Sequence, residues 1–144
     1  MTKKAMLVPV GDMPRLVEVE NYKDIQKLVH GNIEPCSWVF DDAPSVYVND
    51  EGKFTQRPNR AIYAEAKDAG NLKWDGTRVK EGECLDVLFG DFICIGFDEE
   101  TGEDRNISDD EIQRVIERFG SYESIDSGII ETLKIQLGAA VERS

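Results

Sequence analysis

The alternation of apolar and polar residues along the chain predicts a mixture of short strands and helices. Residues 5–10 form an apolar run that Gly11 and Pro14 close. Residues 16–20 then alternate apolar and acidic side chains, a period of two that is typical of a strand with one buried face. Together the two runs predict an antiparallel hairpin.

A short amphipathic helix is expected after this hairpin. Asn21 has the side chain of a helix N-cap. Ile25, Leu28 and Val29 then recur at helical spacing. We expect Gly31 to end the helix in a left-handed conformation, because glycine adopts a positive φ without strain.

Two further strands are expected over residues 33–40 and 45–49, separated by a turn that contains Pro44. Residues 49–52 predict the next turn. In that turn Gly52 is free to take a positive φ.

The middle of the chain changes from polar to strongly apolar. Residues 64–83 are polar and rich in glycine, and we expect a long excursion or flap there. Residues 85–97 hold two apolar runs around Gly90, which predict central strands or one long bent strand.

Two helices are expected near the C-terminus. Ser108 and Glu111 have the spacing of a capping box, which predicts a helix from about 109 to 119. Beyond it, apolar residues recur every four positions and predict a last helix that packs on the sheet, joins two copies or binds a partner. This apolar stripe consists of Ile125, Ile129, Leu133 and Leu137.

The order of these elements predicts an α+β fold, with an antiparallel or mixed sheet packed by two to three helices. We expect one α+β domain over residues 1–120 and a helical extension over residues 121–144. A chain of 144 residues is long enough to bury one core without disulfides.

Acidic residues dominate the charge of the chain. There are 29 Asp and Glu residues against 17 Lys and Arg, which gives a formal net charge of −12. The resulting negative field opposes binding to nucleic acid and to anionic membranes. One explanation of this acidity is solubility. The alternative is that the carboxylates imitate a nucleic-acid backbone or pair with a basic partner.

The cysteines and the apolar runs indicate a cytoplasmic protein. Cys36, Cys84 and Cys94 lie in or beside apolar runs and lack the spacing of a metal site, so we expect reduced thiols. No apolar run has the length of a signal peptide or a membrane helix. We therefore expect no membrane association.

Catalytic and metal-binding motifs are not evident. His30 lies at the end of a predicted helix without a catalytic partner close in sequence, which favours a structural role. Asp98, Glu99 and Glu100 belong to an acidic segment that does not match the spacing of an EF-hand, so we interpret it as a solvated turn. We expect no metal and no cofactor.

The strongest polar constellation is a corner that Pro58 fixes. Arg57, Asn59 and Arg60 together offer two guanidinium groups and an amide that can hold a phosphate or a carboxylate. Alternatively, the asparagine completes the turn and the arginines pair with surrounding acids. Trp38 and Tyr63, with Tyr47 and Trp74, can add stacking faces for a nucleobase, or they are core and rim residues.

Three segments resemble a family of small proteins of phages, plasmids and other mobile elements, known as domain of unknown function 3846. They are the helix-to-strand junction 25–34, the turn 49–53 leading to 58–61, and the strand 86–91 followed by 95–96. The resemblance covers about residues 5 to 119. The chain departs from the usual pattern in its longer excursion and in its tail. The resemblance implies a mobile-element or viral accessory protein, and it implies no reaction or ligand.

These observations support three functional hypotheses. The first is a non-enzymatic inhibitor that binds a host protein through its acidic face, with Asp98, Glu99 and Glu100, and through the apolar stripe. The second is a sponge that captures a nucleotide-like immune signal between the 57–60 corner and the aromatic residues. The third is a small hydrolase that uses Asp86 and Asp91 as paired carboxylates.

Overall fold

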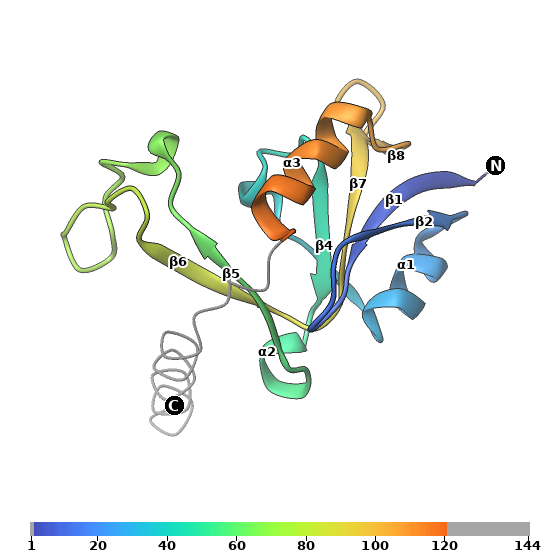
Figure 1. Cartoon of the computed structure of the whole chain (residues 1–144), viewed down its shortest axis with the longest axis horizontal. Helices are drawn as coiled ribbons and strands as arrows, with labels where there is room; N and C mark the ends of the chain where they lie inside the picture. The colour runs from blue at the N-terminus through green and yellow to red at the C-terminus, as the bar shows by residue number, and fades with distance from the viewer. Residues whose placement is uncertain (1, 121–144) are drawn as a thin grey trace.

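The computed structural model describes residues 2–120 of the chain and has an α+β fold, as the sequence predicts (Figure 1). The larger sheet has the strand order β2-β1-β7-β4-β3, with β8 paired to β7, and its paired strands are antiparallel. These strands are β1 (Lys3–Val8), β2 (Arg15–Val19), β3 (Ile33–Pro35), β4 (Ser45–Asn49), β7 (Phe92–Asp98) and β8 (Glu103–Arg105).

A second sheet consists of β5 (Pro58–Tyr63) and β6 (Cys84–Phe89), which are also antiparallel. The chain passes from β6 directly into the central strand β7, and Gly90 takes a φ of 77° at the junction. The two apolar runs around Gly90 therefore belong to different sheets.

Helices cover both faces of the larger sheet. Alternate residues of β7 point to opposite faces. Ile93 and Ile95 pack in one core cluster with Ile25 of α1 (Tyr22–Val29). On the other face, Phe92 packs against Phe119 of α3 (Asp109–Phe119), with ring centroids 5.3 Å apart. The sheet is thus buried on both sides, which accounts for the near-continuous apolar run in β7.

The helix starts follow the sequence signals. The side chain of Asn21 accepts hydrogen bonds from the backbone amides of Lys23 and Asp24 and caps α1. Ser108 and Glu111 form the expected capping box, and α3 spans the predicted residues. The predicted N-terminal hairpin is also present, as β1 and β2.

Two glycines serve close packing rather than positive φ. His30 takes the left-handed conformation at the end of α1, with a φ of 64°, so the expectation for Gly31 was wrong. A Cβ at Gly31 would lie 2.7 Å from Nδ2 of Asn49. Gly52 begins the one-turn helix α2 (Gly52–Thr55), and a Cβ there would lie 3.0 Å from the carbonyl oxygen of Phe89.

Several short elements also differ from the expectation. The strand expected over residues 33–40 ends at Pro35 and is followed by the 3₁₀ turn η1 (Ser37–Val39). Another 3₁₀ turn, η2 (Ala66–Asp68), follows β5. Part of the acidic segment after β7 forms the strand β8, because its backbone pairs with the end of β7.

Within residues 2–120, no helix has the length and apolar character that crossing a bilayer requires. The apolar stripe Ile125, Ile129, Leu133 and Leu137, together with the proposed extension 121–144, lies outside the described residues.

Candidate functional site

An arm projects from the rest of the molecule, which we call the body (Figure 1). The arm consists of β5, β6 and the segment 64–83 between them. This segment is a long excursion between the two strands, as expected, and it contains η2 and one isolated bridge between Leu72 and Arg78. Beyond the strands, the amide of Ala64 donates to the carbonyl of Glu83 at 2.7 Å, and the amide of Val79 donates to Asn71 at 2.8 Å.

The tip of the arm, residues 71–79, exposes two large apolar side chains. Trp74 is 99% exposed and Leu72 is 66% exposed. Isolated apolar residues are common on protein surfaces, but tryptophan is the residue type most often found as an energetic anchor of protein interfaces. The tip is therefore the strongest candidate for a recognition surface among the described residues.

Hydrogen bonds hold the backbone of the tip in a defined turn. The amide of Lys73 donates to the carbonyl of Thr77 at 2.7 Å, and Gly76 takes a φ of 86°. Oδ1 of Asp75 accepts from the Thr77 hydroxyl at 2.6 Å and from the Thr77 amide at 3.0 Å. These bonds lower the pKa of Asp75. The turn is thus ordered before any partner binds, which reduces the entropic cost of binding.

An ion pair links the tip to the residue that precedes β6. The ammonium of Lys73 donates to Oε1 of Glu83, and this bond lowers the pKa of the carboxyl group. The guanidinium of Arg78 donates to the carbonyl of Gly70 at 2.9 Å. Both long cationic side chains are therefore tied along the arm, whereas the indole of Trp74 stays open to solvent.

The polar corner expected to bind a ligand is instead the joint between arm and body. Asn59 and Arg60 are fully buried. Nδ2 of Asn59 donates at 2.8 Å to the carbonyls of both Val8 and Gly90. These contacts tie β5 to β1 and to the β6–β7 junction, so the amide of Asn59 serves the interior rather than a surface ligand.

Arg60 makes a similar set of internal contacts. Its Nε donates to the carbonyl of Phe119 at 3.1 Å, and Nη2 donates to the carbonyl of Asp12 at 2.6 Å. Nη1 donates to Oδ1 of Asn59 at 2.6 Å. A cation at the C-terminal end of α3 is also favoured by the helix dipole. We therefore replace the expected ligand role of Arg60 with a structural one.

The remaining members of the expected ligand set do not come together. Arg57 is exposed. Trp38 and Tyr63 line two different cavities. The hydroxyl of Tyr47 donates to Asp104 at 2.8 Å. Tyr47 lies on β4 in the body, whereas Trp74 lies at the arm tip. The described residues thus do not assemble the nucleotide-like pocket that the sequence allowed.

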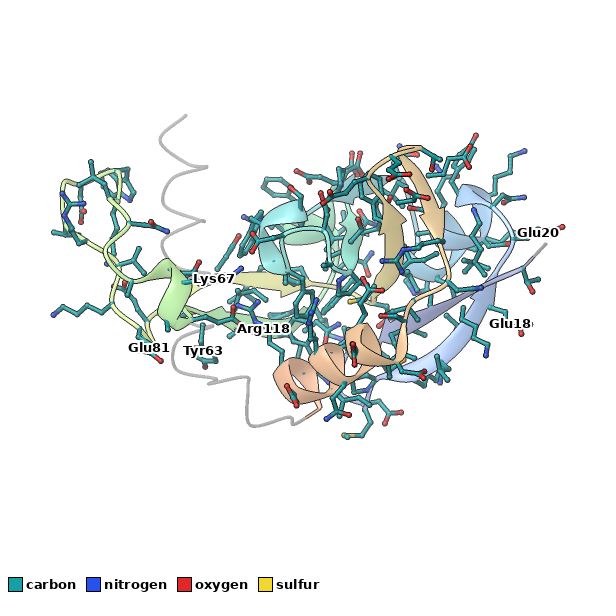
Figure 2. The ribbon with its side chains drawn as sticks, turned by 90° about the horizontal axis from the view of Figure 1, so that it is seen from above. Glu18, Glu20, Tyr63, Lys67, Glu81 and Arg118 are labelled. Carbon is teal, nitrogen blue, oxygen red and sulfur yellow. The ribbon has the colours of Figure 1, made fainter. Side chains whose placement is uncertain are left out.

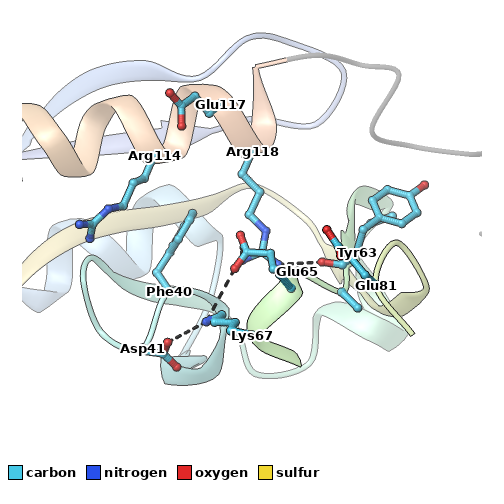
Figure 3. Close-up of a pocket in the computed structure, with 12 residues that line it drawn as sticks. Phe40, Asp41, Tyr63, Glu65, Lys67, Glu81, Arg114, Glu117 and Arg118 are labelled. Carbon is cyan, nitrogen blue, oxygen red and sulfur yellow. Dashed lines mark hydrogen bonds and ion pairs between the residues drawn. The ribbon is translucent and has the colours of Figure 1, made fainter. Parts of the chain in front are cut away.

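The larger of these cavities, about 730 Å³, lies between the base of the arm and α3 (Figure 3). The guanidinium of Arg118 lies 5.5 Å from the ring centroid of Phe40 and donates to the carbonyl of Tyr63 at 3.1 Å. The ammonium of Lys67 donates to Asp41 at 2.7 Å. Both cations already have partners within the chain, which disfavours anion binding in this cavity. Their contacts instead connect the arm to the body.

The carboxylates considered for hydrolysis have separate partners. Asp86 lies on β6, with its Oδ1 3.7 Å from the ammonium of Lys53. Asp91 contacts Nε2 of His30 at 3.1 Å and accepts from the amide of Val10 at 2.8 Å. Asp86 and Asp91 therefore do not form the carboxylate pair that the hydrolase hypothesis requires.

The pair of His30 and Asp91 could not be found from the sequence, because 61 positions separate the two residues. The sequence predicts a structural role for His30, and Asp91 in the turn after Gly90 is its partner in the fold. Both side chains lie near the surface, where the pair ties the end of α1 to the β6–β7 junction.

The other expected partner residues lie on the body. Asp98, Glu99 and Glu100 form the turn between β7 and β8, where Oδ1 of Asp98 accepts from the amide of Glu100 at 2.9 Å. Glu99 and Glu100 are exposed. Figure 2 places further carboxylates, Glu18 and Glu20, on the body at the end away from the arm.

Metal and thiol chemistry find little support in residues 2–120. No group of three or more His, Cys, Asp or Glu side chains there is arranged to hold a metal ion. Cys94 is fully buried, and burial raises the pKa of its thiol. A protonated, inaccessible thiol is a poor nucleophile.

The chain belongs to the family described as Domain of unknown function (DUF3846), whose model matches residues 1–120. No curated protein and no solved structure matches the chain. The family match covers the body and the arm, and it confirms the resemblance seen in the sequence.

Proposed function

We propose that this DUF3846 protein is a non-enzymatic accessory protein of a phage or related mobile element, which binds and neutralises a host protein. Binding uses the arm tip as the anchor. The body supplies the acidic field that brings the two proteins together. The observation that carries the proposal is the ordered turn that presents Trp74 with a 99% exposed side chain.

The position of Trp74 favours insertion into a pocket of a partner. The arm projects from the body (Figure 1), so a side chain at its tip can enter a concave surface without a clash from the body. Burial of a tryptophan side chain supplies a large apolar contact. Leu72, 66% exposed on the same tip, extends this contact.

The net charge supports a basic partner. A formal charge of −12 on a small protein steers it toward positive surfaces and raises the rate of association at low salt. The exposed carboxylates of Glu99 and Glu100 lie on the body and act at a distance from the arm. The acidic surface thus sets the rate of encounter, and the arm tip sets the lifetime of the complex.

The internal pairing of the polar residues supports a function without chemistry. Asn59 and Arg60 hold backbone carbonyls, and Asp86 and Asp91 have different partners. Burial raises the pKa of Cys94 and leaves its thiol protonated at neutral pH. Occupation of a host surface requires none of these groups to react.

A capture experiment tests this function. The immobilised full chain is mixed with a bacterial lysate, and bound proteins are identified by mass spectrometry for the wild type, Trp74→Ala and Tyr22→Ala. Tyr22 is an exposed aromatic residue on α1 and serves as the control. We expect one protein to bind the wild type and Tyr22→Ala, with affinity for Trp74→Ala lower by at least about tenfold.

The captured protein is then purified and measured with the wild type. We expect its activity to fall in proportion to the amount of added chain, and the association rate to fall steeply with salt. The proposal is wrong if every bound protein binds Trp74→Ala as well as the wild type. It is also wrong if the purified chain turns over a substrate and one side-chain replacement abolishes that turnover.

A further inference from the structure

A second cavity, of about 310 Å³, lies on the body side of β6, next to α2. Its floor is apolar. Two exposed aromatic side chains, Trp38 of η1 and Phe54 of α2, line it together, and they are 42% and 76% exposed. The apolar floor consists of Val48, Val87, Leu88 and Phe89. We call this cavity the Trp38–Phe54 pocket.

Carboxylates outnumber cations around this pocket. Glu34, Asp50 and Asp86 line it, against a single ammonium, that of Lys53. The ammonium lies 3.7 Å from Oδ1 of Asp86, and half of the lysine side chain is exposed. Lys53 is therefore a rim residue that an incoming cation can displace from Asp86.

The thiol of Cys36, which also lines the pocket, responds to this charge. Burial and the negative charges of Glu34 and Asp86 raise its pKa to about 11, and the charge of Lys53 acts in the opposite direction. Burial is the larger cause, and the contributions of Glu34 and Asp86 show that these carboxylates make the potential at the thiol more negative. The same potential favours a bound cation.

We infer that the Trp38–Phe54 pocket binds an arginine side chain of the partner protein, with its guanidinium against Trp38 and paired with Glu34 and Asp86. The inference rests on the proposed function, because it assigns a second contact to the same protein partner. It adds a chemical identity to that contact, which the arm tip alone does not give.

The chemistry of the pocket selects for arginine. A planar guanidinium stacks on an aromatic face and offers paired donors to carboxylates, whereas an ammonium is a compact and strongly hydrated charge. Phosphate groups would be repelled by the three carboxylates. A volume of about 310 Å³ is at the lower end of small-molecule sites, which suits one side chain better than a nucleotide.

Packing holds the pocket open in the absence of a partner. Nδ2 of Asn49 donates to the carbonyl of Val29 at 3.0 Å, and Oδ1 accepts from the amide of Glu51 at 2.8 Å. These bonds fix the turn that begins α2. The absence of a side chain at Gly52 lets α2 approach the backbone of Phe89. The walls therefore need little rearrangement on binding.

The chain contains two tryptophans, which provides a direct test. In a Trp74→Phe background, Trp38 is the only source of tryptophan fluorescence. The probes are acetyl-Gly-Arg-Gly-amide and two matched peptides, one with citrulline and one with lysine. We expect saturable change in emission with the arginine peptide, with a dissociation constant on the order of millimolar. The citrulline and lysine peptides should bind at least about tenfold more weakly.

Matched variants test the carboxylates in the same background. Glu34→Gln removes a charge that lines the pocket, and Glu51→Gln removes a charge on the neighbouring turn that does not. We expect Glu34→Gln to weaken arginine-peptide binding about tenfold, and Glu51→Gln to leave it unchanged. The inference is overturned if the citrulline peptide or the lysine peptide binds as tightly as the arginine peptide. It is also overturned if the arginine peptide gives no saturable signal.

This test is independent of the capture experiment, because the peptides require no host protein. Peptide binding without a Trp74-dependent partner would support the pocket and reject the proposed function. A Trp74-dependent partner without peptide binding would reject the pocket alone.

Discussion

Different kinds of interaction stabilise the body and the arm. In the body, α1 and α3 cover opposite faces of one sheet. The α1 face has a core of buried aliphatic side chains, and the α3 face has a core that also contains Phe92 and Phe119. The arm has a small cluster around Ala61, Val87 and Phe89, and hydrogen bonds continue it to the tip. The difference places stability in the body and leaves the arm tip free for recognition.

Charge follows the same division. The arm, residues 58–89, contains five basic and six acidic residues, so its formal charge is −1. The rest of the chain therefore carries −11 of the total of −12. A nearly neutral arm on an acidic body can approach a partner surface closely while the body supplies the long-range field.

The joint between the two regions is a buried polar network. Arg60 links β5 to the end of α3 and to the loop at Asp12, and Asn59 links β5 to β1. Buried polar groups of this kind are stable only when their hydrogen bonds are complete. Asn59 and Arg60 therefore help to orient the arm, together with Ile62 and Leu88, which pack in the core cluster of the body.

The largest effect is expected in the body, for Phe119→Ala. Phe119 is fully buried, and its ring makes edge contacts with Phe92 and Phe40. The cavity should lower the free energy of unfolding by about 3–5 kcal/mol, as measured by urea denaturation. Phe54→Ala, at a side chain that is 76% exposed, is the control and should cost less than about 0.5 kcal/mol. Equal losses for the two variants would contradict the assignment of the core.

A smaller but more specific effect is expected at the joint, for Arg60→Met. The substitution keeps an apolar side chain of similar length and removes the donors to Phe119 and Asp12. We expect a loss of about 1.5–3 kcal/mol, the range for hydrogen bonds to a charged group. Amide hydrogen exchange should also accelerate in β5 and β6 more than in β7. The exposed neighbour Arg57 offers the matched control, Arg57→Met. If exchange rises uniformly, Arg60 is a general core residue and does not orient the arm.

The smallest effect on stability is expected at the arm tip, for Trp74→Ala. An exposed side chain without packing partners should change the free energy of unfolding by less than about 0.5 kcal/mol. The same variant should lose partner binding. Trp74→Ala is therefore expected to affect binding without affecting the free energy of unfolding. Thermal unfolding of the isolated chain gives the measurement. A loss above about 1 kcal/mol would show that Trp74 packs within the chain, and the comparison between arm and body would then fail.

Local signals in the sequence predicted the elements that depend on neighbouring residues. The capping box at Ser108 set the start of α3, and Asn21 set the start of α1. Alternation predicted the hairpin of β1 and β2. Such features follow from contacts within a few positions, so a single sequence contains them.

The candidate site was harder to predict, because its roles depend on distant contacts. Arg60 had the composition of a ligand contact, and burial against Phe119 gave it a structural role. Trp74 was one of several aromatic residues, and only the projecting hairpin distinguished it as fully exposed. His30 met Asp91 across 61 positions.

The sequence by itself determined the α+β class, the acidic charge and the capped helices, because propensity, periodicity and composition act locally. Only the tertiary structure decided the roles of Gly31 and Gly52, the burial of Asn59 and Arg60, and the exposure of the arm tip. Each of these depends on which distant segment packs against the residue. Burial and close contact are properties of the packed molecule, and the linear pattern does not record them.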